Sequence, residues 1–428
     1  MTRASQRCRP LVGLLAVSLC FFVLPLRAQV VTDSNWRADV KTVTLYKNGV
    51  ELEAPVLLLG GDDRLLLRFD VLGAEADNYR YRIQHCDNRW KVDDMEPYEY
   101  INGFEEGPIE NYNPSFTTLT DYVNYYQYLP ATHSQLLISG NYVLSVFPQD
   151  SPDSILFTRR FCVVEGSLKV EAMVGVPYDN ARVLQRREVE VTVSDNPEYR
   201  GSLFPPTLNP AYLSVQVRQN GRQDTRRELP FGGYDRGALG YRHRPENLFD
   251  GGNNFRYFDI SNIRTAMYNV VSIEEYGGEW FAMLRPLENR SDKSFYTEQS
   301  LNGGMKVNVW DRSQKQTEAD YVYVNFSLPM RTPYLDGNIY VVGDLTQWHM
   351  DERSRMEYNP DLKAYTLRLL LKQGYYAYQL LFVPVGGHEG LTSVLEGDHY
   401  ETPNNYYVYV YYRSPGDRYD RLVAYKKI

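Results

Sequence analysis

The sequence predicts an all-β protein, in which a signal peptide precedes three consecutive β-sandwich domains of immunoglobulin-like or early-set-like type. First, the 428 residues include 37 tyrosines, 30 glycines and 23 prolines, a composition that favours strands separated by turns. Second, apolar and polar side chains alternate with the period of a strand in several short segments, most clearly in Tyr79–Cys86. Third, leucine and alanine show little helical patterning. Many short strands joined by turns are typical of sandwiches.

The first 28 residues are predicted to be a signal peptide. Three arginines (Arg3, Arg7 and Arg9) precede the apolar segment Leu11–Leu24, and Ala28 is a plausible last residue before cleavage. No later segment is long and apolar enough to span a bilayer as a helix. We therefore expect an exported protein without a helical anchor.

The charge of the chain disfavours two classes of partner. Cleavage after Ala28 removes four arginines and no acids, so the formal net charge moves from -8 to -12. An acidic exported chain is a poor candidate for binding nucleic acid or anionic lipid.

The first domain is expected over residues 29–165. Its predicted strands are 42–46, 65–69, 79–86, 141–147 and 156–164. The two cysteines that remain after cleavage, Cys86 and Cys162, both lie in these strands. They could form a disulfide across two sheets in an oxidising compartment, or be two buried small residues that never meet.

A long aromatic loop follows the strand Tyr79–Cys86. It carries Trp90, Tyr98, Tyr100 and Phe104 among acids and glycines before strand-like sequence resumes at residue 115. A loop of this length either packs on its own side chains or forms a binding surface. Both alternatives are open for each of the four aromatic residues.

The second domain is expected over residues 166–328, with strands at 168–170, 188–193 and 213–217. Its segment Asp250–Asn253 is rich in Asp, Asn and Gly. It lacks the ligand spacing and the distant glutamate of a calcium-binding loop, so we expect a turn and no metal.

The third domain is expected over residues 329–428. The segments Ile339–Trp348, Tyr365–Leu369 and Gly374–Gln379 resemble the starch- and glycogen-binding modules of amylases and related proteins. That resemblance implies a sandwich in which Trp348 is one aromatic platform for a sugar ring. The second platform has no counterpart, because Val385–His388 contains no tryptophan. The alternative is that Trp348 packs a loop against the sandwich.

No catalytic constellation is evident. The six histidines are not placed at metal-ligand spacing, and His388-Glu389 is followed by Thr392 where a zinc protease needs its second histidine. G-x-S-x-G, P-loop and C-x-x-C motifs are missing from the sequence. We therefore expect a protein that is not an enzyme and has no cofactor.

Several motifs resemble the type IX secretion system plug protein family, formerly a family of unknown function. They are H-C-D-x-x-W at 85–90, E-Y-I-N-G-F at 99–104, S-F-x-T at 115–118 and Y-Q-Y-L-P at 126–130, with further similar segments at 247–260, 319–322 and 401–420. The resemblance implies a periplasmic protein at the outer membrane. It also implies that the partner is the outer-membrane translocon barrel, whose pore the plug closes when no substrate is present.

Two functions follow as expectations. In the first, the chain is a non-enzymatic periplasmic plug that binds the translocon through Trp90, Tyr98, Tyr100 and Phe104, since aromatic side chains are enriched at protein interfaces. In the alternative, it is a periplasmic carbohydrate-binding protein that uses Trp348 of the third domain. The missing second platform makes a glycan the less favoured partner.

Overall fold

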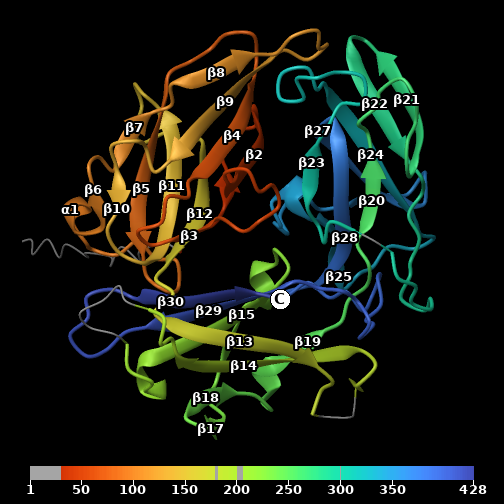
Figure 1. The fold of residues 1–428 in the computed structure, drawn as a ribbon. Helices are drawn as coiled ribbons and strands as arrows, with labels where there is room; N and C mark the ends of the chain where they lie inside the picture. The colour runs from red at the N-terminus through yellow and green to blue at the C-terminus, as the bar shows by residue number, and fades with distance from the viewer. Residues whose placement is uncertain (1–29, 179–181, 200–205, 299) are drawn as a thin grey trace, which may run out of the picture.

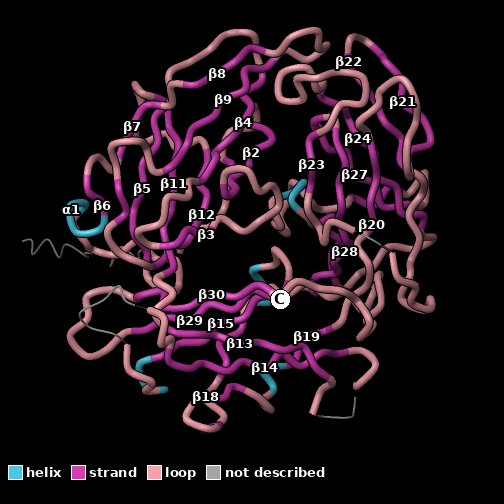
Figure 2. Tube along the Cα trace, in the orientation of Figure 1, coloured by secondary structure: helices cyan, strands magenta, loops and turns pink. Residues whose placement is uncertain are grey.

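The computed structural model describes residues 30–178, 182–199, 206–298 and 300–428, and consists almost entirely of strands and loops (Figure 2). The predicted signal peptide lies outside the described residues. Within these ranges the helices are α1 (Pro97–Tyr100) and the short 3-10 helices η2 (Pro210–Tyr212), η3 (Gln223–Thr225), η4 (Pro245–Asn247) and η5 (Asp344–Thr346). None of the helices in the described part of the chain has the length and apolar character needed to cross a bilayer.

The first domain is a sandwich of two main sheets. One sheet has the order β1-β12-β11-β5-β7, with β3 parallel to β12, and the other has the order β2-β4-β9-β8. The core between them consists of buried residues from Val40 to Val163. The strands are β1 (Ser34–Asn35), β2 (Val40–Lys47), β3 (Val56–Leu58), β4 (Leu65–Leu72), β5 (Tyr79–Cys86), β6 (Ile101–Asn102), β7 (Glu106–Pro108), β8 (Asn111–Pro114), β9 (Tyr122–Leu129), β10 (Gln135–Leu136), β11 (Gly140–Pro148) and β12 (Phe157–Val164).

The disulfide considered between Cys86 and Cys162 is absent, and both thiols are free and buried. Asn141 of β11 pairs with Cys86 of β5 on one side and with Cys162 of β12 on the other. The cysteines are therefore two strands apart in one sheet, about 9.5 Å at the usual strand spacing. A disulfide needs Cα atoms within about 7 Å of each other. Both cysteines are therefore buried free thiols that are too far apart to form a disulfide with each other.

The second domain also contains two sheets. The first has the order β13-β14-β18-β17 with β19 beside β14, and the second has the order β16-β15-β29-β30. Its core combines residues 168–249 with residues 406–424. The strands are β13 (Leu168–Gly175), β14 (Arg186–Asp195), β15 (Leu213–Gln219), β16 (Arg227–Leu229), β17 (Gly233–Asp235), β18 (Ala238–Tyr241), β19 (Leu248–Asp250), β29 (Tyr406–Tyr412) and β30 (Arg421–Lys427).

The third domain occupies the chain between these two parts of the second. One sheet pairs β28 with β20, β23 and β25, and the other has the order β21-β22-β24-β27-β26. Its core residues run from Phe258 to Leu395. The strands are β20 (Arg256–Asp259), β21 (Val270–Tyr276), β22 (Glu279–Leu284), β23 (Met305–Val307), β24 (Tyr321–Pro329), β25 (Gly337–Val342), β26 (Glu357–Asn359), β27 (Ala364–Lys372) and β28 (Gly374–Pro384).

The predicted boundary between residues 328 and 329 is wrong. It falls inside β24, which pairs along its whole length with β27. The C-terminal strands, assigned to the third domain from sequence, instead belong to the second, because β29 pairs with β15 from Leu213↔Tyr412 to Gln219↔Tyr406. The third domain is thus an insertion in the second, and the partners of β29 are too distant in sequence for local patterns to reveal.

The three domains surround a common centre (Figure 1), and a buried or half-buried polar contact joins each pair. In Figure 1 the first domain lies on the left, the third on the right and the second below both. The contacts are Lys372 Nζ to Asp70 Oδ2 (2.6 Å), Arg421 Nη2 to Glu165 Oε2 (2.7 Å), and Gly390 N to Asp224 Oδ2 (3.0 Å). Each domain is therefore held against both of the others.

Candidate functional site

The aromatic segment after β5 is a folded structure, in which α1, β6, β7 and β8 lie where one long loop was expected. It begins with a turn, because Asp87 Oδ1 accepts hydrogen bonds from the backbone N–H groups of Arg89 (2.8 Å) and Lys91 (2.9 Å). β6 then pairs with β10. This scaffold gives each of the four predicted aromatic residues a defined environment.

Tyr100 is a core residue, so the prediction that it contacts a partner is wrong. It is 3% exposed, and its hydroxyl donates to Glu105 Oε2 at 2.9 Å. Burial, reinforced by that carboxylate, raises the pKa of Tyr100 well above its ordinary value. His85 lies nearby in the same interior, where Nδ1 contacts Asp93 and Nε2 lies 3.2 Å from the carbonyl oxygen of Ser139. His85 is thus a hydrogen-bonded core histidine.

Trp90 lies at the junction of the first and second domains. Its backbone has a φ of 67°, and the Arg160 guanidinium lies 4.8 Å from its ring centroid. The ring also packs against a small buried cluster that contains Cys162 and Tyr411. Trp90 therefore packs between two domains, which accounts for its aromatic character, and it is not assigned to a partner surface.

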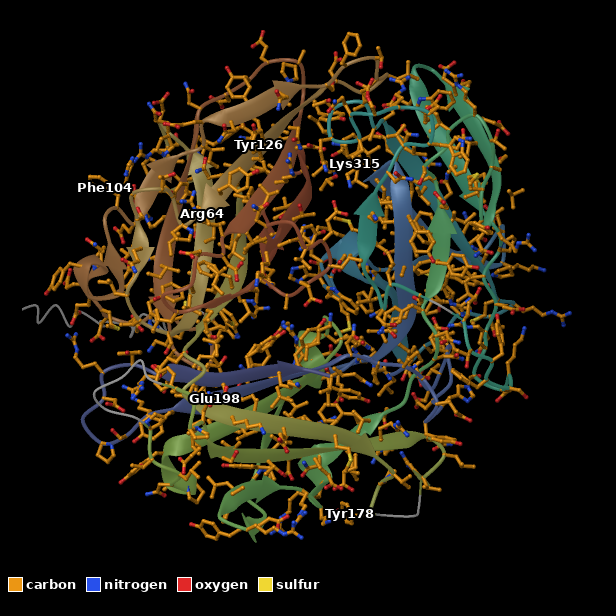
Figure 3. All side chains as sticks on the ribbon, viewed as in Figure 1. Arg64, Phe104, Tyr126, Tyr178, Glu198 and Lys315 are labelled. Atoms are coloured by element: carbon orange, nitrogen blue, oxygen red, sulfur yellow. The ribbon has the colours of Figure 1, made fainter. Side chains whose placement is uncertain are left out.

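The remaining two residues, Tyr98 and Phe104, are exposed on an ordered support. They are 76% and 79% exposed, and Leu137, which is 43% exposed, follows β10 nearby. The N–H of Leu137 donates to the carbonyl oxygen of Tyr100 (2.9 Å), which ties this residue to the end of α1. We call Tyr98, Phe104 and Leu137 the first-domain aromatic edge. Figure 3 shows Phe104 at the outer margin of the first domain, pointing away from the centre.

Gly103 fixes the position of Phe104. Its φ is +108°, and a Cβ at this position would lie 2.5 Å from the carbonyl oxygen of His133. Only glycine fits both the backbone conformation and the close approach. The chain therefore turns sharply here, and Phe104 projects from a turn that is anchored on β6 and β10.

Trp348 is not an open sugar platform. A Cβ added to Gly221 of the second domain would lie 2.1 Å from the indole, and one added to Gly303 would lie 2.2 Å from it. The indole Nε1 also donates to Asp344 Oδ1 at 2.7 Å. The indole is thus packed between two glycines, one of them from another domain, and Trp348 faces the space between the domains rather than an outer surface that a glycan chain could reach. The expectation of a glycan platform is corrected to an interdomain packing contact.

Substitution of Gly221 by alanine tests this contact. We expect a loss of about 1–3 kcal/mol in the free energy of unfolding, because the new methyl group overlaps the indole of Trp348. Urea unfolding followed by tryptophan fluorescence measures it. Gly175→Ala is the matched control, since a Cβ at that position meets no atom within 4 Å. An unchanged stability for Gly221→Ala would contradict the packing described here.

One group of side chains in the described residues has the composition of a metal site. Ligand atoms of Glu188, Glu190 and His243 lie within 4.8 Å of one another. Glu188 is buried, but its carboxylate already accepts from the N–H groups of His243 (2.7 Å) and Tyr178 (2.8 Å). The carboxylate therefore serves to hold two loop segments, and no ligand is assigned to it.

The buried polar network between the first and third domains could not be predicted from the sequence. Asp70 is 0% exposed. Its carboxylate accepts hydrogen bonds from Lys372 Nζ (2.6 Å), the hydroxyl of Tyr321 (2.6 Å) and Nδ2 of Asn124 (2.6 Å). Lys372 ends a strand of mostly apolar residues, which is an unusual position for a lysine. That position was the only available signal, and it does not identify a partner in another domain.

Comparison with known proteins identifies the family. Residues 40–165 match the model of the type 9 secretion system plug protein first domain, a range that coincides with the first sandwich. A crystal structure of a hypothetical protein from Parabacteroides merdae ATCC 43184 is 32% identical, with a TM-score of 0.88, and the match covers 92% of this chain and 98% of that one. No curated protein matches the chain. The chain belongs to the type IX secretion system plug protein family.

Proposed function

We propose that this protein is a non-enzymatic periplasmic plug, which binds the periplasmic end of the outer-membrane translocon of type IX secretion and closes its pore when no substrate is present. Family membership supports a role in this secretion system. The interlocked arrangement of the domains supports closure, since a body that blocks a wide opening must resist deformation.

The observation that carries the proposal is the joining of three sandwiches into one block. Each domain contacts both others through hydrogen bonds or ion pairs of buried or half-buried groups. The third domain is inserted in the second, so the chain passes between these two domains twice. Interfaces of this kind restrict the relative motion of domains more than a flexible linker does.

We further propose that the first-domain aromatic edge contacts the translocon. Large aromatic side chains that remain exposed on a fixed scaffold are typical anchors of protein interfaces, because little side-chain entropy is lost when they bind. Tyr98 and Phe104 meet this description, since both are more than three-quarters exposed.

The double variant Tyr98→Ser/Phe104→Ser tests both proposals. The tagged protein is purified from its native cells after gentle solubilisation of the envelope, and its partners are identified. The wild-type protein should recover a very large outer-membrane protein, more of it when secreted substrate is depleted. The double variant should recover at least about 10-fold less, since loss of an aromatic anchor costs about 2 kcal/mol or more.

The control is Tyr276→Ser, which removes an 80% exposed tyrosine from the tip of the β21–β22 hairpin in the third domain. It should retain the partner. Equal losses in both variants would reject the aromatic edge as the contact but keep the plug proposal. Recovery of no membrane partner by the wild-type protein would reject the plug proposal itself.

The alternative function, carbohydrate binding through Trp348, has no support from the position of this residue. Soluble glucan should leave the tryptophan fluorescence unchanged, because the indole is packed between Gly221 and Gly303.

A further inference from the structure

A cavity of about 480 Å³ lies where the three domains meet. Its lining includes Arg160 of the first domain, Arg218 and Tyr409 of the second, and Trp348 of the third. Its volume falls in the range of small-molecule sites, about 300–1,000 Å³. Arg89 and Arg226 also line it and are exposed, which places these two residues where the cavity opens to solvent.

Two arginines that line this cavity, one buried and one half-buried, have only uncharged hydrogen-bond acceptors among the described residues. Arg159 is 7% exposed and donates to the carbonyl oxygen of Thr158 (2.6 Å) and to Asn35 Oδ1 (2.9 Å). Burial lowers its pKa to about 10. The charges of Asp33 and Asp344 offset part of that shift, but neither carboxylate accepts a hydrogen bond from Arg159 among the described residues. Buried charges are normally paired directly, because an unpaired one is costly.

Arg218 is the second of these arginines. Its guanidinium lies 5.0 Å from the ring centroid of Tyr407, and Nη2 donates to the hydroxyl of Tyr409 at 3.3 Å. Its Nε is buried and has no hydrogen-bond partner. In the amide orientation that satisfies its hydrogen bonds, Gln223 accepts from both Arg218 and Arg160 through its side-chain oxygen. Two guanidinium groups therefore converge on one neutral acceptor.

The carboxylates of the cavity are already engaged. Asp33 Oδ2 accepts from Arg160 Nη2 (2.9 Å), and Glu53 Oε1 pairs with Lys427 Nζ (3.2 Å). Asp344 accepts a hydrogen bond from the indole of Trp348, and burial raises its pKa above the ordinary value. The cavity thus has an excess of positive charge in a protein whose formal net charge is -8.

The aromatic lining gives the cavity a second property. Trp90, Trp348, Tyr407 and Tyr409 all contribute to its wall. Flat rings beside guanidinium groups suit a ligand that has both an anionic group and an apolar or planar part. Guanidinium groups bind carboxylate and phosphate through paired hydrogen bonds.

We propose that this central cavity binds a small organic anion, with its carboxylate or phosphate beside Arg218 and Arg160, whose guanidinium groups converge on Gln223, and its body against the aromatic wall. Such a ligand contacts all three domains at once and stabilises their arrangement, because it binds only the assembled form. The proposal does not depend on the plug function.

Titration of the purified protein with phenyl phosphate tests the proposal. Two of the five tryptophans line the cavity, so binding should change the intrinsic fluorescence saturably and raise Tm. Inorganic phosphate should bind more weakly, and phenol should give no change at the same ionic strength. Arg218→Met, which keeps the apolar stem, should weaken phenyl phosphate binding by at least 10-fold.

The matched control is Arg368→Met, since Arg368 lies over the ring of Phe281 at 5.5 Å and is not part of the cavity lining. It should bind as the wild-type protein does. If Arg218→Met does not fold, Arg226→Met replaces it, because that side chain is exposed at the opening and should weaken binding several-fold. The proposal is overturned if neither phosphate nor phenyl phosphate gives a saturable change. It is equally overturned if the substituted protein titrates like the wild-type one.

Discussion

Replacement of Lys372 by methionine is expected to lower the free energy of unfolding by about 3–5 kcal/mol, because it leaves the buried carboxylate of Asp70 without its cation. The side chains of Lys372 and Asp70 are both 0% exposed, and their charged atoms are 2.6 Å apart. Burial lowers the pKa of Lys372, and the field of Asp70 offsets part of that shift. Urea unfolding followed by tryptophan fluorescence measures the loss.

Two further variants isolate the cause. Lys372→Met/Asp70→Asn should recover part of the stability, since removal of both charges leaves no unpaired ion in the interface. Lys47→Met removes the cation of the half-exposed pair with Asp63 and should cost at most about 1 kcal/mol. A loss for Lys372→Met no larger than that of Lys47→Met would show that the buried pair does not hold the first and third domains together.

Replacement of Glu396 by glutamine should destabilise the third domain by a similar amount, about 3–5 kcal/mol. The carboxylate is 1% exposed and pairs with Arg256 (2.9 Å) and Arg290 (2.5 Å), whose side chains are 9% and 14% exposed. It also accepts from the N–H of Leu380 in β28. The substitution deprives two largely buried guanidinium groups of the buried carboxylate that pairs with both. Calorimetric unfolding at pH 7 measures the effect.

The dependence of this effect on pH identifies its origin. Burial raises the pKa of Glu396, but Arg256 and Arg290 lower it more, so the folded-state pKa is below the ordinary value of 4.5. The carboxylate therefore contributes stability above pH 4.5, and that contribution is lost as the pH falls through the folded-state pKa. The wild-type protein and Glu396→Gln should converge in stability in acid. A constant difference from pH 7 to strong acid would contradict this assignment. Glu357→Gln, at an exposed pair with Arg355, should change stability by less than about 0.5 kcal/mol.

The sequence predicted strands better than it predicted which strands pair. Tyr79–Cys86 forms β5 with the predicted bounds, and its alternation of side chains is seen in the burial pattern. Such a strand can be predicted from local sequence, because its side chains alternate between a face that packs against the core and a face that does not. The partner of β29 depends instead on contacts across about two hundred residues, so the insertion of the third domain could not be predicted from local patterns.

The exposure of the four predicted aromatic site residues could not be predicted from local sequence either. Trp90, Tyr98, Tyr100 and Phe104 have similar sequence surroundings, yet one is buried, one packs between domains and two are exposed. Exposure of an aromatic residue in an irregular segment is decided by the turn geometry around it, here the left-handed Gly103 and the pairing of β6 with β10. Trp348 likewise matched the position of a sugar platform, and its contact with Gly221 of the neighbouring domain could not be predicted from the local sequence.

The return of the chain to the second domain has a consequence for biogenesis. The first and third sandwiches each draw their core from one continuous stretch, whereas the second lacks half of one sheet until β29 and β30 are in place. During vectorial delivery of the polypeptide from its N-terminus, the second sandwich is therefore the last to close. The compact form therefore requires β29 and β30. A chain truncated before residue 406 would expose an unpaired strand edge at β15, a feature that promotes aggregation.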